Sequence, residues 1–239
     1  MKFFFLFVTT LIIHSVLSAQ ELQIIPESKF RLSLTYGITA VNPEDINTRI
    51  ASSNAAFGST TKSLKSMPEM TATISLRPTD DMKVVVLRGG YILSKREFSF
   101  SVPETQNGPT PTGTTNGTIT ETYTAYPLSI GIGGTTEKSD AQFQLEFIYG
   151  LGYVREEGTY TSSAGKKTSY SRSLFSPTYG FRVNGSIVAP LTSFIGLQFE
   201  AGYRYLLFDE FEDEITAQSS PLDFSMSGIQ GSIGLSVKL

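Results

Sequence analysis

The sequence predicts an all-β fold: an eight-stranded antiparallel up-and-down barrel that crosses a membrane. Three observations predict it: apolar and polar residues alternate in eight segments, the connections between segments alternate between long and short, and the chain opens with an export signal. The alternation is clearest in QFQLEFIYGLGYV (142–154), where every second residue is aromatic or aliphatic. Because alternate residues of a strand point to opposite sides, this strand has one apolar face and one polar, glycine-rich face.

The first twenty residues, MKFFFLFVTTLIIHSVLSAQ, have the composition of a signal peptide. Lys2 provides the positive start, an apolar run follows, and Ser18 and Ala19 offer small residues for cleavage. The apolar run is shorter than the ~20 residues that a spanning helix needs. We therefore assign residues 1–19 to a signal peptide and residues 20–239 to one barrel domain.

Composition excludes several classes of function. The chain has 19 basic and 22 acidic residues, and removal of Lys2 with the signal leaves 18 against 22, a net charge of −4. This balance predicts no nucleic-acid partner, because such partners usually require a basic patch. The chain has no cysteine, which suits a bacterial envelope protein better than a small disulfide-rich secreted one. The single histidine, His14, lies in the signal, so the mature chain lacks the commonest proton-transferring side chain; we expect no enzymatic activity and no cofactor.

The eight alternating segments follow one another along the mature chain. In the third, the choice of face is settled by a gapless alignment of Pro78–Tyr91 with Pro190–Tyr203, which puts Leu87 on the apolar face. Pro127 is expected to break a ladder bond or mark a bulge, and a bulge near Gly228 would reconcile the alternation before and after it. The segments cover residues 29–39, 69–77, 82–101, 124–134, 142–154, 176–188, 193–207 and 228–239.

The connections alternate in length. Long loops on one side and tight turns on the other are typical of outer-membrane barrels, and with eight strands both chain ends fall on the short-turn, periplasmic side. The acidic run DEFEDE (209–214) in the last long loop is interpreted as a solvated loop rather than a cation site. The long polar loops are predicted at 40–66, 102–118, 155–173 and 209–222, and the short turns at 78–81, 134–140 and 189–192.

Periodicity does not separate a membrane barrel from a soluble, lipocalin-like one, which turns its apolar face inward. Tyrosines near the segment ends suggest an interfacial girdle, and a charge on the lipid face at mid-depth would cost ~2–4 kcal/mol. We therefore expect the apolar faces to meet lipid and the charged residues to pair inside, with a bridge linking Arg88 to Glu200. The expected lumen charge network comprises Arg31, Arg77, Arg88, Glu146, Arg182, Glu200 and Arg204.

Several of these features together resemble the small eight-stranded outer-membrane β-barrel proteins of the porin-like superfamily. They are the export signal, the eight strands, short turns with Pro-Thr or Pro-Leu, Tyr-Pro-Leu at 126–128, and a terminal strand that alternates from Gly231 to Leu239. The resemblance implies residence in the bacterial outer membrane, contact with its lipids, and insertion by machinery that reads the terminal strand. That family usually ends in an aromatic residue, and this chain ends in Leu239.

Two functions therefore follow from the sequence. The first is a monomeric, non-enzymatic outer-membrane barrel with a structural or surface-interaction role, or with narrow passage of small solutes. The alternative is a soluble exported barrel that binds an apolar ligand inside.

Overall fold

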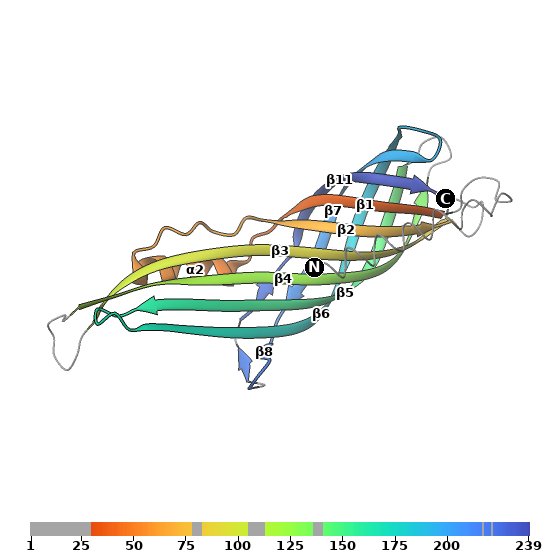
Figure 1. Ribbon diagram of the computed structural model, residues 1–239. Coiled ribbons are helices and arrows are strands. Elements are labelled where there is room, and N and C mark those ends of the chain that lie inside the picture. The colour runs from red at the N-terminus through yellow and green to blue at the C-terminus, as the bar shows by residue number, and fades with distance from the viewer. Residues whose placement is uncertain (1–29, 78–82, 105–112, 136–140, 217, 221) are drawn as a thin grey trace.

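The main element of the protein is a closed ring of eight antiparallel strands (Figure 1). Our computed structural model describes residues 30–77, 83–104, 113–135, 141–216, 218–220 and 222–239, so the predicted signal peptide lies outside the described residues. The ring strands are β1 (Phe30–Ala40), β2 (Ser66–Leu76), β3 (Lys83–Glu104), β4 (Gly113–Thr135), β5 (Ala141–Thr161), β6 (Lys167–Pro190), β7 (Ile195–Phe208) and β11 (Gly228–Lys238).

Each ring strand pairs with its neighbours in the chain, and the ring closes through β11. β11 pairs with β7 on one side and with β1 on the other. The amide of Leu239 donates to the carbonyl oxygen of Phe30 at 3.0 Å, so the first and last described residues meet at one end of the barrel. The predicted eight-stranded up-and-down barrel is confirmed.

The side chains of β5 show which face of the wall is apolar. Phe143, Leu145 and Phe147 are 60%, 51% and 55% exposed, while Glu146 between them is 1% exposed. The same alternation runs around the ring, because cross-strand partners share a face. The outward apolar belt is therefore confirmed, and the lipocalin-like alternative, which requires these side chains inside, is wrong.

An aromatic row marks one edge of the apolar belt. Tyr91 of β3 contacts Tyr126 of β4 with ring centroids 5.5 Å apart, and Tyr126 contacts Tyr153 of β5 at 6.0 Å. Tyr153 in turn contacts Phe175 of β6 at 5.1 Å. Tyrosine rings at such an edge fit the boundary between acyl chains and polar head groups.

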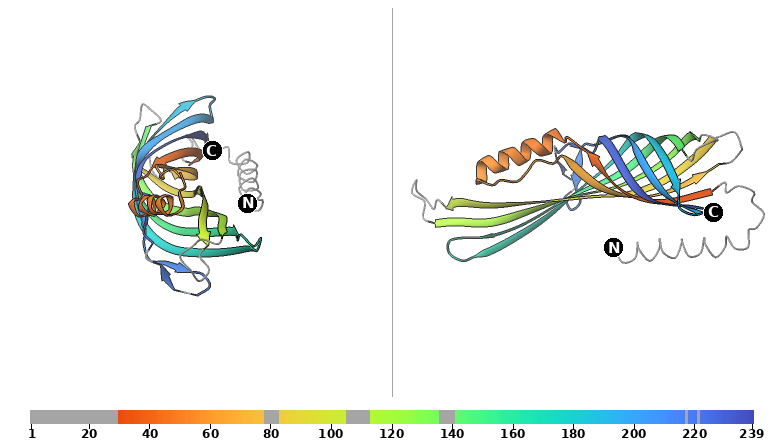
Figure 2. Two further views of the ribbon diagram at one scale, coloured as in Figure 1. Left: turned by 90° about the vertical axis from the view of Figure 1, so that its left-hand side faces the viewer. Right: turned by 90° about the horizontal axis from the view of Figure 1, so that it is seen from above.

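Four of the ring strands are about twice as long as the others. β3, β4, β5 and β6 have 21 to 24 residues, against 11 to 14 in β1, β2, β7 and β11. Since ~9–11 residues cross a membrane, these strands continue roughly ten residues, or ~33 Å, beyond the belt. Figure 2 shows this four-stranded extension projecting from the ring. The predicted loops at 102–118 and 155–173 are therefore wrong where the structure describes them as strand, at 102–104, 113–118, 155–161 and 167–173; residues 105–112 lie outside the described residues.

The other two long connections contain short elements of their own. The first holds a helix, α2 (Glu44–Phe57), which ends at Gly58 in the left-handed conformation. The last holds three short strands, of which β8 pairs with β6 and β10 pairs with β7. Within the described ranges, no helix has both the length and the apolar character needed to span a membrane. The short strands are β8 (Phe211–Asp213), β9 (Ser219–Ser220) and β10 (Phe224–Ser225).

The two predicted irregularities have different outcomes. At Pro127 the β3–β4 ladder is interrupted: pairing continues from Gly89 with Leu128 to Ile92 with Ala125, without a change of register. The bulge near Gly228 is wrong. Phe224 pairs with Phe208 and Gly228 pairs with Arg204, so both pairs belong to the same register and no residue is inserted between them. Phe224 therefore faces the interior like Gly228, and it is apolar because the interior of the barrel is apolar at that level.

Gly152 gives a test of how tightly this interior is packed. A Cβ atom added there would lie 2.6 Å from Cδ1 of Phe208. We expect Gly152→Ala to lower the free energy of unfolding by ~1–3 kcal/mol through overpacking, measured by urea unfolding followed by circular dichroism. Gly185→Ala is the matched control, because a Cβ atom added there would lie 3.8 Å from its nearest neighbour, the carbonyl oxygen of Ala201. Equal effects at the two glycines would contradict this packing.

Candidate functional site

Six buried charged side chains of alternating sign form one continuous series of contacts in the half of the lumen enclosed by the belt. None is more than 6% exposed. In order of contact, this ionic chain consists of Glu200, Arg88, Glu146, Arg182, Glu69 and Arg204. Three glutamates face three arginines, so the chain carries no net charge when all six are ionised.

Successive members of the ionic chain lie within ion-pair distance. Arg88 is 2.7 Å from Glu200 and 3.2 Å from Glu146. Arg182 is 3.6 Å from Glu146 and 2.8 Å from Glu69, which also contacts Arg204. Each inner member therefore touches two residues of opposite charge, which compensates the cost of removing it from water.

Polar side chains from the remaining strands complete the hydrogen bonding of the ionic chain. Ser129 of β4 donates to Glu146, and Ser232 of β11 donates to Glu200 at 3.1 Å. Gln144 accepts from Arg88 at 3.1 Å, and Thr39 of β1 accepts from Arg204 at 3.2 Å. All eight ring strands therefore contribute to one buried network, which ties the wall together across the lumen.

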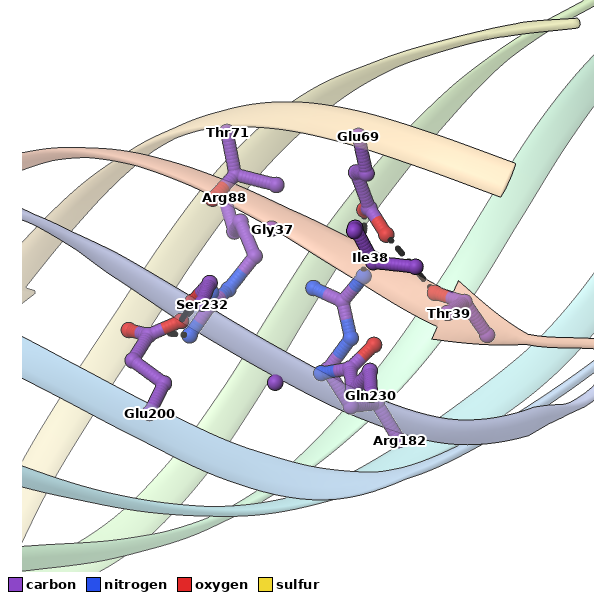
Figure 3. Close-up of a pocket in the computed structure, with 11 residues that line it drawn as sticks. Gly37, Ile38, Thr39, Glu69, Thr71, Arg88, Arg182, Glu200, Gln230 and Ser232 are labelled. Carbon is purple, nitrogen blue, oxygen red and sulfur yellow. Dashed lines mark hydrogen bonds and ion pairs between the residues drawn. The ribbon is translucent and has the colours of Figure 1, made fainter. Parts of the chain in front are cut away.

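A small cavity lies beside the ionic chain (Figure 3). Arg88 and Arg182 reach into it from opposite sides, and its other polar lining residues include Glu69, Glu200 and Gln230. Both carboxylates are already bonded to arginines, so the lining is a set of paired charges. Among the described residues, no group of three or more His, Cys, Asp or Glu side chains could hold a metal ion.

The structure brings together five of the seven residues predicted for the lumen network. They are Arg88, Glu146, Arg182, Glu200 and Arg204, and the bridge expected between Arg88 and Glu200 is present. The other two lie nearer the turn end of the barrel, outside the ionic chain. Arg31 is buried at the level of Ser75 and Lys238, and Arg77 donates to Thr135 at 3.2 Å.

Glu69 is the member that the sequence reading missed, although it bonds to two arginines. It begins the second alternating segment and shares the parity of Thr71 and Thr73, which face inward. This position on the inner face could have identified Glu69 as a member of the network. A carboxylate that faces the interior requires a basic partner, and other strands of the barrel place arginines there.

Above the ionic chain the lumen is mainly apolar, so the charged residues expected to pair inside occupy only the half of the lumen that the belt encloses. Inward-facing residues of the ring meet residues of the first and last long connections to form an apolar plug. Tyr123 and Phe224 have ring centroids 5.1 Å apart, and Phe208 is 6.4 Å from Phe224. The plug includes Ile46, Ile50, Leu64, Met67, Ile92, Tyr123, Ile148, Val154, Leu206, Phe208, Phe211, Phe224 and Met226.

Helix α2 is fixed over the plug by an arginine and two glutamates. Arg49 lies 2.7 Å from Glu121 of β4 and also contacts Glu156 of β5. Glu121 and Glu156 are cross-strand partners, so their carboxylates lie side by side on the inner face of the extension. Tyr123 donates a hydrogen bond to Glu121 at 2.5 Å. One arginine therefore holds the helix against two adjacent carboxylates.

Burial, together with the neighbouring Glu156 carboxylate, raises the pKa of Glu121 above its ordinary value, even though Arg49 opposes the shift. A raised pKa in the folded state means that the folded protein binds this proton more tightly than the unfolded chain. The resulting stabilisation is complete below the unfolded-state value of about 4.5 and is lost as the pH rises through the folded-state value.

We therefore expect the contribution of Glu121 to the free energy of unfolding to fall as the pH rises above about 4.5. Glu121→Gln keeps the hydrogen-bonding shape without the charge, so the variant should lose that part of the fall; the measurement is urea unfolding at a series of pH values. Glu157→Gln, on the exposed face of the same hairpin, is the control and should keep the parent's pH dependence. If Glu121→Gln and the parent have parallel pH profiles, the assignment is wrong.

Comparison with known proteins finds solved structures that are similar to this chain. No family model matches the chain, and no curated protein matches it. Neisserial surface protein A is 13% identical over 90% of this chain and 100% of its own, with a TM-score of 0.34. Ail, the attachment invasion locus protein of Yersinia pestis, solved with the heparin analogue sucrose octasulfate, is 10% identical over 87% of this chain and 98% of its own, with a TM-score of 0.30.

The chain's own geometry defines its fold. It has a closed ring of eight antiparallel strands, an outward apolar belt with an aromatic row, and buried charges inside. The chain has the fold of the small outer-membrane β-barrels.

Proposed function

We propose that the protein is an integral outer-membrane barrel without catalytic activity, whose role is structural and interactive at the bacterial surface. The observation that supports this most strongly is the closed lumen. The ionic chain fills one half and the apolar plug fills the other, with α2 fixed above it. Eight strands enclose a space only wide enough for side chains, so these two layers leave the extension as the part of the molecule that meets other molecules.

The membrane position follows from the energetics of the wall. The belt presents large apolar side chains outward, and the charges of the same strands are buried. In water this arrangement would expose a continuous apolar band. In lipid the band contacts acyl chains, and ring closure leaves no strand edge unpaired at the level of the belt. We further propose that the belt contacts outer-membrane lipids and that β11 is the strand read by the barrel-insertion machinery, as its alternation up to Lys238 supports.

Narrow passage of small solutes is the less supported role. A permeating ion would have to break pairs such as Arg88–Glu200 and then displace aromatic rings of the plug, including Phe224 and Phe208. A second function as an apolar-ligand carrier would require an inward apolar belt, and the belt faces outward.

Two measurements test the proposal. The full-length protein should require detergent for extraction from bacterial envelopes and should migrate differently on gels before and after heating, as folded membrane barrels do. In planar lipid bilayers it should produce no discrete currents. Steady unitary conductance in bilayers would contradict the closed lumen, and extraction into buffer without detergent would contradict the membrane position.

A further inference from the structure

Two arginines of the ionic chain each keep one N–H group that the described residues leave without an acceptor. The Nη atoms of Arg88 bond to Glu200 and Gln144, and Nη2 of Arg182 bonds to Glu69. The Nε atom of each arginine is buried and has no hydrogen-bond partner among the described residues. Buried N–H groups are almost always bonded in folded proteins, because otherwise nothing replaces their bond to water. These two groups therefore require an acceptor.

Gln230 of β11 has the complementary requirement. Its Oε1 atom is buried and has no donor among the described residues. Gln230 pairs with Thr39 and Gly202. The side chain of Thr39 bonds to Arg204 in the lumen, and cross-strand partners share a face. Gln230 therefore faces the ionic chain with an oxygen that requires a donor.

All three side chains line the same small cavity (Figure 3). Arg88, Arg182 and Gln230 belong to β3, β6 and β11. The space open to the centre of a water molecule is about 10 Å³, close to the ~10–15 Å³ that one water needs. The cavity therefore has room for one molecule of about the size of water, surrounded by polar groups whose hydrogen bonding is incomplete.

The charges around the cavity decide between water and an ion. Glu69 and Glu200 line it together with Arg88 and Arg182, so two negative charges balance two positive ones. A halide or a metal ion would add a charge without compensation to a buried site, which is costly. Water adds no charge. It can accept two hydrogen bonds and donate two, so a single molecule can satisfy two N–H groups and one oxygen.

We propose that this cavity binds one water molecule as a permanent part of the fold. The water accepts hydrogen bonds from Nε of Arg88 and Nε of Arg182 and donates one to Oε1 of Gln230. Three hydrogen bonds are typical of a buried water.

The bound water has a structural role at the seam of the ring. β11 closes the ring between β7 and β1, and Ser232 of β11 already donates to Glu200 at 3.1 Å. Through Gln230, the water adds a second link from this strand to the ionic chain, and that link reaches β3 and β6 on other sides of the wall. The proposal concerns the lumen alone, so it stands or falls independently of the membrane position.

A crystal structure of the protein purified in detergent, at a resolution that shows ordered water, tests the site. We expect one solvent peak at ~2.7–3.2 Å from Oε1 of Gln230 and from the Nε atoms of Arg88 and Arg182. Crystals soaked in sodium bromide identify the ligand, because bromide scatters anomalously and water does not. A bromide peak in the cavity overturns the proposal. A cavity without a peak that bonds to Gln230 and at least one of the two arginines also overturns it.

Gln230→Met tests the same water in solution. Methionine has a similar length but no oxygen, so the water loses the acceptor for its own proton and an apolar group faces the site. Long-lived internal waters are counted by oxygen-17 magnetic relaxation dispersion of the protein in detergent micelles. We expect one fewer such water in Gln230→Met than in the parent protein.

Gln142→Met is the matched control for this count. Gln142 is also buried, but it lies outside the cavity lining and its Oε1 atom already accepts from Gln144 at 3.0 Å. Its substitution should leave the number of long-lived waters unchanged. An unchanged count in Gln230→Met, or an equal loss in Gln142→Met, overturns the proposal. If Gln230→Met does not fold, the crystal structure of the parent protein decides.

Discussion

Arg88→Met should lower the free energy of unfolding by about 3–5 kcal/mol, more than the double variant Arg88→Met with Glu200→Gln. Breaking a buried ion pair leaves a charge without compensation in the lumen, and this penalty typically amounts to 3–5 kcal/mol. Arg88 and Glu200 are the last two members at one end of the ionic chain. Removing both charges leaves the other four members of the ionic chain, which carry two charges of each sign. They are Glu146, Arg182, Glu69 and Arg204.

The contacts also predict which of the two single variants loses more stability. Arg88 bonds to both Glu200 and Glu146, so Glu200→Gln leaves Arg88 with one partner and should cost less than Arg88→Met. The measurement is urea unfolding in detergent micelles followed by circular dichroism. Arg155→Met with Glu157→Gln is the control, because this pair is exposed and should change stability by less than ~1 kcal/mol. A double variant whose loss equals the sum of the single losses would show that Arg88 and Glu200 do not act as a pair.

Phe147→Arg should destabilise the inserted barrel by about 2–4 kcal/mol, because the side chain lies in the middle of the belt and a charge there faces acyl chains. Phe147 is 55% exposed on the outer face, between Leu145 and Tyr149. The measurement is the urea midpoint of the vesicle-inserted protein, together with the fraction that folds into vesicles.

The matched control lies on the same strand and the same face. Thr159 is twelve positions beyond Phe147 on β5, in the part of the extension that stands clear of the belt. Thr159→Arg should leave both quantities unchanged within ~0.5 kcal/mol. Equal losses at Phe147 and Thr159 would contradict the height assigned to the membrane.

The ring itself could be predicted because lipid imposes a strict pattern on it. Inside the belt every second residue must be apolar and every charge must be inward, so Phe143 and Glu146 reveal both the strand and its orientation. In the extension no lipid covers the outer face, and that pattern disappears. Thr114, Thr115 and Thr118 are good strand formers, but their polarity led to the prediction of a loop at 102–118.

The apolar interior above the ionic chain could not be predicted from the residue pattern of any single strand. Ile148 and Phe208 share the parity of polar residues, and they are buried because α2 and the last long connection fold over them. Helix α2 left a weak signal in Ile46 and Ile50, four residues apart, followed by Gly58 at its end. What covers these residues comes from distant parts of the chain, which local periodicity does not report.

The central claim is that apolar side chains of the belt face lipid while charged side chains of the same strands fill the half of the lumen that the belt encloses. Its most direct test uses single cysteines, since the chain has none of its own. A fluorescent label on Phe147→Cys should be strongly quenched by lipids with a nitroxide on the acyl chain, and a label on Ser129→Cys, buried beside Glu146, should not. Quenching at position 129 with protection at position 147 would contradict it.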